Sequence, residues 1–312
     1  MIVSKIHFLN VTAFFLGQLF HQSNRRISIS IRVDSVFLLA VRSFMQTNFY
    51  QGLKIQQDNF NEIEDAIVVE APLQMNINNE AYTVVMRTPG NDIALIRGLL
   101  YAEDIYKGKG ALHAEINKEE SGIPTIINVS IPKDQLGKGY MNKRTLLSVS
   151  SCGICGKTEL KNLKVEGDQL ASKTNFSADA IHEMMRSMAA NQAGFKITGG
   201  SHAASVFNAK QELLTLKEDI GRHNAVDKVI GDLLQKNTLH SASYLLVSGR
   251  VSFEIVTKAF VAKIPVIVAV SACSSLAIDF AKEFGICLIG FTRDQKLTVY
   301  THIHRLEKLT NV

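Results

Sequence analysis

The sequence has little cysteine, proline or tryptophan, and over most of its length neither charge is in excess. Its 312 residues include four cysteines, five prolines and no tryptophan. Four cysteines are too few for a disulfide framework in so long a chain, so we expect a reducing, cytoplasmic compartment. The formal net charge of +5 comes mostly from residues 1–50, which carry five basic residues and one acidic residue. A general nucleic-acid-binding surface is therefore not expected.

A short apolar run, "FLNVTAFFLGQLF" (8–20), lies near the N-terminus. Gln18 interrupts it and no clear small-residue cleavage site follows, which argues against a signal peptide. It is also too short for a helix that spans a bilayer, so we expect no membrane association. The expectation for residues 1–50 is a poorly ordered extension, read from an early start, with the functional chain beginning near Met45.

The segment 51–156 is predicted to form a small, strand-rich α+β domain that ends in a cysteine-containing loop. The run "LQMNINNEAYTVVMRT" (73–88) has two β-rich parts around the turn signal Asn78-Asn79, and "TIINVSI" (125–131) predicts a further strand. Between them, Asn91 is expected to cap a helix with a continuous apolar face. That face carries Ile93, Ile96, Leu99 and Leu100. Residues 157–176 are polar and are predicted to be a linker.

The segment 177–312 is predicted to be an α/β domain. Ser177 should cap a helix whose buried face has apolar residues at helical spacing, with Phe176 as a hydrophobic staple. Those buried positions are Ile181, Met184, Met185 and Met188. Strand-like runs "SYLLVSG", "PVIVAVS" and "GICLIGF" then alternate with two apolar helical patterns. Such nearly continuous apolar strands are typical of a parallel sheet that is covered on both faces.

The carboxyl ends of these three strands are the expected ligand-binding edge of an open parallel sheet. They read "SGR" (248–250), "SAC" (271–273) and "FTRD" (291–294). They supply Arg250 and Arg293, with Lys296 close behind, and helices are expected to begin near Ser252 and Ser274. Free N–H groups at helix starts bind anions. We therefore predict a site for a small anion that carries phosphate, although a single loop arginine is more often simply solvated.

Two further polar clusters are candidates for the same site. In "ITGGSHAA" (197–204), a turn with Gly199 and Gly200 is expected to follow a strand and to place His202 where it can titrate. The second cluster is the helix start "KEDIGRHNAVDK" (217–228), which contains Asp219, Arg222, His223, Asp227 and Lys228. We expect His223 to be oriented by Asp219, whereas Asp227 and Lys228 are interpreted as internally paired surface charges.

The loop "SSCGICGK" places Cys152 and Cys155 two residues apart, each followed by a glycine. A zinc site would need further ligands, such as His202 or His223, and only one cysteine pair is present. A thioredoxin-like pair would open a helix after the first strand of its fold, which this mid-chain loop does not. Packing is disfavoured by the lack of apolar neighbours. That leaves an exposed, mobile thiol pair, which suits a cysteine that carries sulfur as a persulfide.

Five long motifs together resemble the FdhD family, the formate dehydrogenase accessory sulfurtransferases. They are "SSCGICGK", "TGGSHAA", "EDIGRHNAVDKVIG", "SGRVSFEIVTKA" and "SSLAIDFAKEFGICLIGFTRD". The resemblance, over about residues 60–302, implies a C-terminal α/β/α layered domain similar to cytidine deaminases, and a homodimer. It also implies that Cys152, assisted by Cys155, takes persulfide sulfur from a cysteine desulfurase. The sulfur would then pass to the molybdenum bis-guanine-dinucleotide cofactor, required by apo formate dehydrogenase.

The resemblance also suggests where that cofactor would bind, as a substrate and without a permanently bound metal. The matching segment comprises Phe291, Thr292, Arg293, Asp294, Gln295 and Lys296. The anion-binding and loop residues already described complete the candidate set: Arg250, Gly199, Gly200, His202, Arg222 and His223.

Two alternatives remain. A zinc-dependent deaminase would combine a His/Cys-x-Glu motif with Pro-Cys-x-x-Cys, and no Pro-Cys pair occurs in the sequence. The second alternative is a non-catalytic chaperone that binds the cofactor with the same arginines. Substitution of Cys152 by alanine would separate that chaperone from a sulfur carrier.

Overall fold

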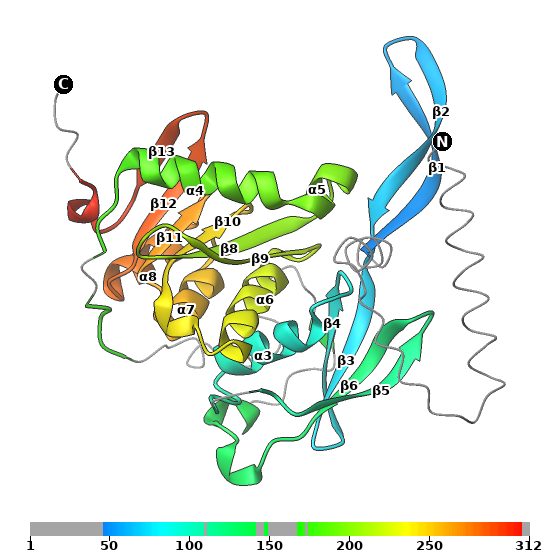
Figure 1. Ribbon diagram of the computed structural model, residues 1–312, viewed down its shortest axis with the longest axis horizontal. Coiled ribbons are helices and arrows are strands. Elements are labelled where there is room, and N and C mark those ends of the chain that lie inside the picture. Colours follow the sequence, from blue (N-terminus) through cyan, green and yellow to red (C-terminus); the bar gives the residue numbers. More distant parts are fainter. Residues whose placement is uncertain (1–45, 109–110, 142–146, 149–166, 172–173, 308–312) are drawn as a thin grey trace, which may run out of the picture. The chain divides into compact units, whose positions relative to one another are not determined.

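The computed structural model describes residues 46–108, 111–141, 147–148, 167–171 and 174–307 (Figure 1). The predicted N-terminal extension up to residue 45 lies outside the described residues. The same holds for the loop with Cys152 and Cys155, so its predicted exposure and reactivity stay predictions.

A six-stranded mixed sheet forms the C-terminal part, with strand order β13-β12-β11-β10-β8-β9. Strands β10, β11 and β12 are parallel to one another, as the alternating apolar runs predicted. The remaining strands β8, β9 and β13 are each antiparallel to their neighbours, which the sequence patterns did not indicate. The bounds are β8 His202–Asn208, β9 Leu213–Asp219, β10 Ala242–Val247, β11 Val266–Ala269, β12 Cys287–Arg293 and β13 Lys296–Val299.

Helices cover both faces of this sheet, which gives three layers (Figure 1). Alternate residues of each strand enter two separate cores, because side chains of a strand point to opposite faces in turn. One core packs against α6 Arg222–Gln235, α7 Phe253–Val261 and α8 Ser275–Glu283. The other packs against α4 Ala178–Asn191, whose start is capped by Ser177 Oγ, 3.1 Å from the backbone nitrogen of Ala180. The predicted cap and buried face of α4 are confirmed.

A second, five-stranded sheet has the order β5-β6-β3-β4-β7 and encloses its own core with helix α3. The predicted turn is confirmed: Asn78 and Asn79 have φ angles of 53° and 68° between β3 and β4. Helix α3 begins directly after Asn91, as predicted, but Asn91 adopts a left-handed conformation and its side chain makes no capping hydrogen bond. The bounds are β3 Ala71–Ile77, β4 Glu80–Arg87, α3 Asp92–Ala102, β5 Ala114–Glu120, β6 Ile123–Val129 and β7 Leu147–Ser148.

The two sheets are joined where α3 lies directly against α6. A Cβ atom added to Gly98 of α3 would lie 1.9 Å from the backbone oxygen of Asp227, and one added to Gly231 would lie 1.8 Å from that of Ala94. No side chain fits at either distance. The two glycines therefore allow the helix backbones to touch, and this contact fixes the start of α6 relative to the second sheet.

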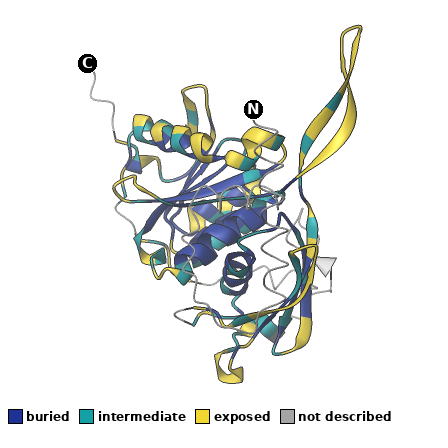
Figure 2. Ribbon diagram, turned by 45° about the vertical axis from the view of Figure 1, so that its right-hand side comes forward, coloured by how far each residue is buried: buried dark blue, intermediate teal, exposed yellow. Residues whose placement is uncertain are grey.

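The remaining elements are a hairpin and short helices. Strands β1 and β2 form a separate two-stranded sheet, most of which is exposed (Figure 2). Within the described part of the chain, no helix is long and apolar enough to cross a membrane. The bounds are β1 Thr47–Gln56, β2 Asn59–Val68, α5 Ala193–Thr198, η1 Lys133–Gln135, η2 Lys138–Met141, η4 Leu239–Ser241 and η5 Ile303–Arg305.

Candidate functional site

One edge of the six-stranded sheet collects the ends of segments that lie far apart in the sequence. The parallel strands β10, β11 and β12 end there, and β8 begins there with His202, because it runs antiparallel to β10. β9 ends at the same edge with Asp219, which is paired with His202. Helix α6 begins just after it at Arg222. Ligands of open α/β sheets bind in this position.

His202 lies against the loop that follows β10. Its Nδ1 atom is 3.4 Å from Ser248 Oγ, which accepts a hydrogen bond of 2.9 Å from the backbone N–H of Ala203. A Cβ atom on Gly249 would lie 3.3 Å from His202 Nδ1 and 3.4 Å from Arg222 Cδ. The glycine therefore leaves the space that both side chains occupy.

Cationic groups surround the His202 imidazole. Burial lowers its pKa, and the positive charges of Arg222 and Arg250 lower it further, while Asp219 opposes them. The imidazole is thus biased toward its neutral form. Three predicted site residues from three separate segments, His202, Arg222 and Arg250, are brought together at this edge.

His223 is the most strongly perturbed histidine of this edge. Only 5% of the residue is exposed, and burial together with the charges of Lys258 and Arg222 lowers its pKa to about 3. Its Nδ1 atom is 3.4 Å from a carboxylate oxygen of Glu254, and neither ring nitrogen has a hydrogen-bond partner among the described residues. The predicted orientation by Asp219 is wrong; the carboxylate nearest in the structure belongs to α7.

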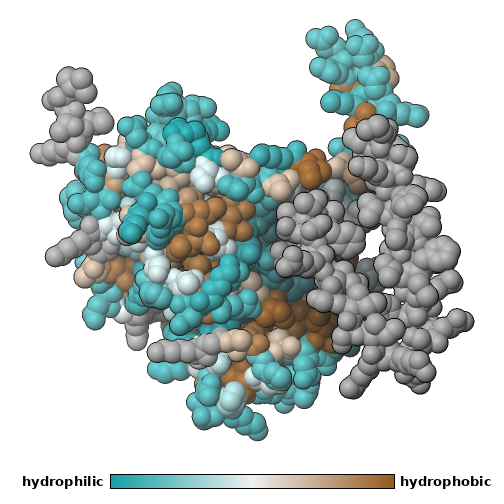
Figure 3. Space-filling view, viewed as in Figure 1, coloured by the Kyte–Doolittle hydropathy of each residue, from teal (hydrophilic) through white to brown (hydrophobic). Residues whose placement is uncertain are grey.

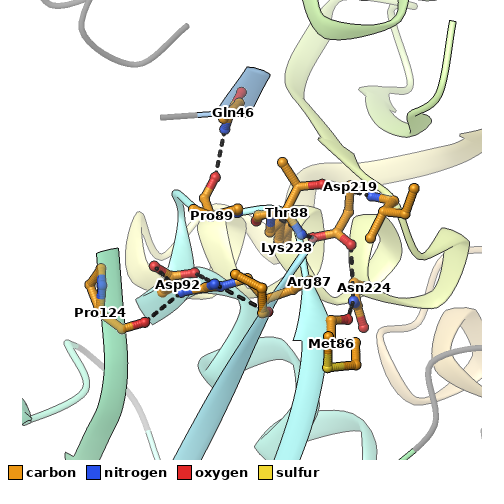
Figure 4. Close-up of polar contacts among 12 residues, drawn as sticks. Gln46, Met86, Arg87, Thr88, Pro89, Asp92, Pro124, Asp219, Asn224 and Lys228 are labelled. Carbon is orange, nitrogen blue, oxygen red and sulfur yellow. Dashed lines mark hydrogen bonds and ion pairs between the residues drawn. The ribbon is translucent and has the colours of Figure 1, made fainter. Parts of the chain in front are cut away.

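Asp219 instead belongs to a buried network that links the site to the second sheet (Figure 4). Its carboxylate is 2.7 Å from Lys228 Nζ and accepts hydrogen bonds from the backbone N–H groups of Gly221 and Thr88 and from the Asn224 side chain. Lys228 also donates to the backbone oxygen of Thr88 at 2.8 Å. Both charged side chains have 0% exposure. A buried pair of this kind is stable only when its remaining polar atoms are also satisfied, as they are here.

The interpretation of Asp227 and Lys228 as surface charges is wrong, although both are paired. Both residues are buried, and Asp227 pairs with Lys258 of α7, so the two neighbours on α6 face different partners. A surface pair at helical spacing does occur farther along the same helix, between Asp232 and Lys236.

The paired glycines lie at the entrance to β8. The preceding element is the short helix α5 and not the predicted strand. Gly199 has a φ of 65° and ends this helix, where the left-handed conformation favours glycine. A Cβ atom on Gly200 would lie 2.8 Å from Val68 Cγ1 at the end of β2. Gly200 therefore lies against the Val68 side chain, whereas a Cβ atom on Gly199 would meet no atom within 4 Å.

The segment 291–296 forms the turn between β12 and β13 at the same edge. Phe291 and the turn residues Asp294 and Gln295 have φ angles of 52°, 52° and 58°, and Arg293 pairs with Lys296 in register. Phe291, Arg293, Asp294, Gln295 and Lys296 are exposed, whereas Thr292 is buried and its hydroxyl has no partner among the described residues. β11 separates this turn from the loop at Arg250. The two cationic groups thus lie apart along one edge.

The predicted helix starts are confirmed. Ser252 and Ser274 precede α7 and α8, and Ser274 Oγ accepts a hydrogen bond from the backbone nitrogen of Ala277 at 3.2 Å. Ser252 makes no such cap, and its hydroxyl has no partner among the described residues. The start of α7 therefore presents backbone N–H groups and an uncommitted hydroxyl next to Arg250.

Cys273 and Cys287, the two cysteines that the structure describes, have surroundings that disfavour the reactive thiolate. Burial raises the pKa of both Cys273 and Cys287 to about 12, so each stays a protonated thiol. No cluster of three or more histidine, cysteine or acidic side chains suited to a metal occurs within the described ranges.

Sequence reasoning missed three residues of this edge. Glu254 and Lys258 lie on α7 and reach His223 and Asp227 of α6. Thr88 directly follows β4 of the second sheet and accepts a hydrogen bond from Lys228. The apolar spacing of α7 indicated only its buried face. The helix contact through Gly98 and Gly231, which brings these groups together, has no signal in a single sequence.

Comparison with known protein families shows the family to which the chain belongs. The model of the FdhD/NarQ family matches residues 68–307. The chain belongs to the FdhD/NarQ family. The match includes every described residue of the sheet edge, together with the loop of Cys152 and Cys155.

Members of the FdhD/NarQ family named sulfur carrier protein FdhD match most of the chain. The protein from Sulfurisphaera tokodaii is 38% identical over 272 residues, which cover 84% of this chain and all of that protein. The protein from Sulfolobus acidocaldarius is 39% identical, over 78% of this chain and 92% of its own length. A solved structure from Desulfotalea psychrophila, assigned as a formate dehydrogenase accessory protein, has a TM-score of 0.66 and 20% identity. It covers 84% of this chain and 100% of that one, and it supports the fold.

Proposed function

We propose that the chain is a cytoplasmic sulfur carrier that serves a formate dehydrogenase. It accepts persulfide sulfur from a cysteine desulfurase on Cys152 and passes it to the molybdenum bis-guanine-dinucleotide cofactor, which then enters apo formate dehydrogenase. Two copies of the chain act as a homodimer. The relatives that share 38–39% identity with the chain are named sulfur carriers, and this observation carries the proposal.

The first step is a thiol–persulfide exchange. The Cys152 thiolate attacks the terminal sulfur of the desulfurase persulfide, the S–S bond of that persulfide breaks, and the desulfurase cysteine leaves as a thiolate. No electrons are gained or lost overall. Of the four cysteines, Cys273 and Cys287 have strongly raised pKa values and supply no thiolate near neutral pH. The reactive thiol is therefore assigned to the Cys152–Cys155 pair.

The second step transfers the terminal sulfur to molybdenum of the bound substrate. The S–S bond of the Cys152 persulfide breaks, a molybdenum–sulfur bond forms, and Cys152 returns to a thiolate. Because the transferred sulfur is reduced to sulfide, a reduced molybdenum centre must supply two electrons. Cys155 assists by protecting or releasing the terminal sulfur.

The cationic sheet edge supports binding of a substrate with two pyrophosphate groups. Arg222 and Arg250 lie beside the start of α7, and Arg293 and Lys296 lie two strands away along the same edge. Arginine side chains and helix N-termini are the groups that recognise phosphate in proteins. The separation of the two groups suits a ligand with two distant anionic parts. His202, whose pKa is lowered, adds a hydrogen-bonding imidazole that is biased toward its uncharged form.

The second candidate function is a chaperone that binds the same cofactor but carries no sulfur. The cationic edge supports this function equally well, because it needs only binding. Cells that lack the native gene and make the Cys152→Ala variant separate the two. The sulfur-carrier proposal predicts loss of formate dehydrogenase activity, whereas Cys273→Ala, the matched control, should retain it. Full activity with Cys152→Ala would favour the chaperone.

A further inference from the structure

The His202 side chain lies beside a carboxylate that could orient it. His202 of β8 is the register partner of Asp219 of β9, and side chains of partners in an antiparallel pair point to the same face of the sheet. A histidine next to an aspartate commonly donates its Nδ1 proton to the carboxylate. In a neutral ring held in that way, Nε2 carries no proton and only accepts hydrogen bonds.

The Asp219 carboxylate has no acceptor position left for His202 (Figure 4). An ionised carboxylate offers about four lone-pair positions, and other donors occupy them. These donors are the backbone N–H groups of Gly221 and Thr88 and the side chains of Asn224 and Lys228, at 2.8, 3.2, 3.0 and 2.7 Å. Another group must therefore determine which ring nitrogen of His202 carries the proton.

Ser248 is placed to do this from the loop after β10. Its backbone N–H donates to the backbone oxygen of Ala203 at 3.0 Å, and its Oγ accepts from the backbone N–H of Ala203 at 2.9 Å. These two bonds hold Ser248 against the start of β8. The hydroxyl still has one proton to donate, and His202 Nδ1 lies 3.4 Å from Oγ. If Nδ1 accepts this proton, the neutral ring must carry its own proton on Nε2.

The Nε2 atom of His202 is available to a ligand. It has no hydrogen-bond partner within the described part of the chain, and the residue is only partly buried. Burial and the charges of Arg222 and Arg250 lower the pKa of His202, so the ring is biased toward the neutral form with a single proton. An N–H donor beside two guanidinium groups is suited to an anionic oxygen.

We propose that Ser248 is a positioning residue that fixes His202 in the Nε2–H form, so that the imidazole donates a hydrogen bond to a phosphate oxygen of a ligand held by Arg222 and Arg250. The other tautomer would turn a lone pair toward that oxygen, and the two lone pairs would repel each other. The inference rests on the anion-binding part of the proposed function and not on sulfur transfer. Sulfur loading of Cys152 is measured separately, so its failure would leave the results below unchanged.

The protonated nitrogen of His202 can be observed by ¹⁵N NMR of the full chain labelled in histidine. Among the nine histidines, its signals are those that disappear in His202→Asn. At about pH 7.5 we expect Nε2 to be protonated and Nδ1 to be unprotonated. In Ser248→Ala the ring should exchange between both tautomers, as the exposed His240 does. Ser248→Thr, which keeps the hydroxyl, should restore the single form.

The matched control for Ser248→Ala is Ser205→Ala. Ser205 lies on β8 with His202, is fully buried, and its hydroxyl has no hydrogen-bond partner among the described residues. The control thus removes a serine hydroxyl from the same strand without removing a bond to His202, and the tautomer should not change. A protonated Nδ1 in the native chain, or a tautomer that is unaffected by Ser248→Ala, would overturn the proposal.

Binding of inorganic pyrophosphate tests which nitrogen donates. The amide nitrogen of a glutamine can occupy the place of Nε2, whereas that of an asparagine reaches only the place of Nδ1. In isothermal titration calorimetry, His202→Asn should bind pyrophosphate about tenfold or more weakly than the native chain, the effect of losing one hydrogen bond to a charged group. His202→Gln should recover most of that loss. Ser248→Ala, in which the donor is present only part of the time, should bind about threefold more weakly.

The comparison of glutamine with asparagine also separates this site from unspecific binding. Hydrophilic side chains cover much of the face shown in Figure 3, and exposed cations such as Lys236 bind pyrophosphate weakly. Such binding does not depend on which amide stands at position 202. An equal loss of affinity in His202→Gln and His202→Asn, or no binding of pyrophosphate by the native chain, would overturn the proposal.

Discussion

Removal of the buried lysine of α6 should destabilise the protein far more than removal of an exposed lysine on the same helix. Lys228 is fully buried, and its Nζ atom lies 2.7 Å from Asp219 and 2.8 Å from the backbone oxygen of Thr88. In Lys228→Met, the Asp219 carboxylate would remain buried without its cation. The affected network joins the sheet edge to the second sheet (Figure 4).

The expected loss in the free energy of unfolding depends on the hydrogen bonds that Asp219 keeps in the Lys228→Met variant. Loss of one partner of a buried ion pair typically costs 3–5 kcal/mol. Because Asp219 keeps hydrogen bonds from Gly221, Thr88 and Asn224, we expect a loss of about 3 kcal/mol, the lower end of that range. A second change, Asp219→Asn, removes the isolated charge, so the double variant should recover about 1–2 kcal/mol.

The matched control is Lys236→Met. Lys236 pairs with Asp232 at 2.7 Å but has 53% of its side chain exposed. Exposed pairs of this spacing contribute about 0.5 kcal/mol. The free energy of unfolding of all four proteins would be measured in urea. If Lys228→Met costs no more than Lys236→Met, the assigned role of the buried network is wrong.

Two further predictions concern the histidine and the helix contact of the same region. The pKa of His223 is about 3 in the folded protein, whereas its ordinary value is 6.5. Between these two pH values the unfolded chain binds a proton that the folded protein does not bind. The free energy of unfolding therefore falls as the pH drops from 6.5 toward 3. From pH 7.5 to pH 5 the native protein should lose about 2 kcal/mol more than His223→Asn in urea unfolding, and equal losses would contradict the assignment. At the contact of α3 with α6, Gly98→Ala should cost about 3 kcal/mol or prevent folding, because its Cβ would overlap the backbone oxygen of Asp227. Thermal unfolding would measure this, and a change below about 0.5 kcal/mol, the usual range at uninvolved surface positions, would contradict the close helix contact.

Local patterns in the sequence predicted much of the C-terminal architecture. Apolar runs, glycine and proline positions and the cap at Ser177 are all set by residues close in the chain, and the structure confirms the elements they indicated. The position of Arg250 at the carboxyl end of β10 also followed, because the ends of parallel strands must share an edge.

Partners that come from distant segments could not be predicted in this way. The hydrogen bond of Lys228 to Thr88 spans 140 residues, and that of Lys258 to Asp227 spans 31. The sequence suggested that Asp227 and Lys228 are paired surface charges, because a helical pattern considers one helix alone. The contact between α3 and α6 determines the actual partners. The left-handed conformation of Asn91 likewise does not follow from the local capping pattern.

The measurement that tests the proposed function most directly is the mass of the intact protein after incubation with a cysteine desulfurase and cysteine. The sulfur-carrier account predicts the addition of one sulfur atom, mapped by peptide analysis to Cys152, absent in Cys152→Ala and retained in the control Cys273→Ala. No added sulfur with an active desulfurase, or sulfur that persists in Cys152→Ala, would contradict it.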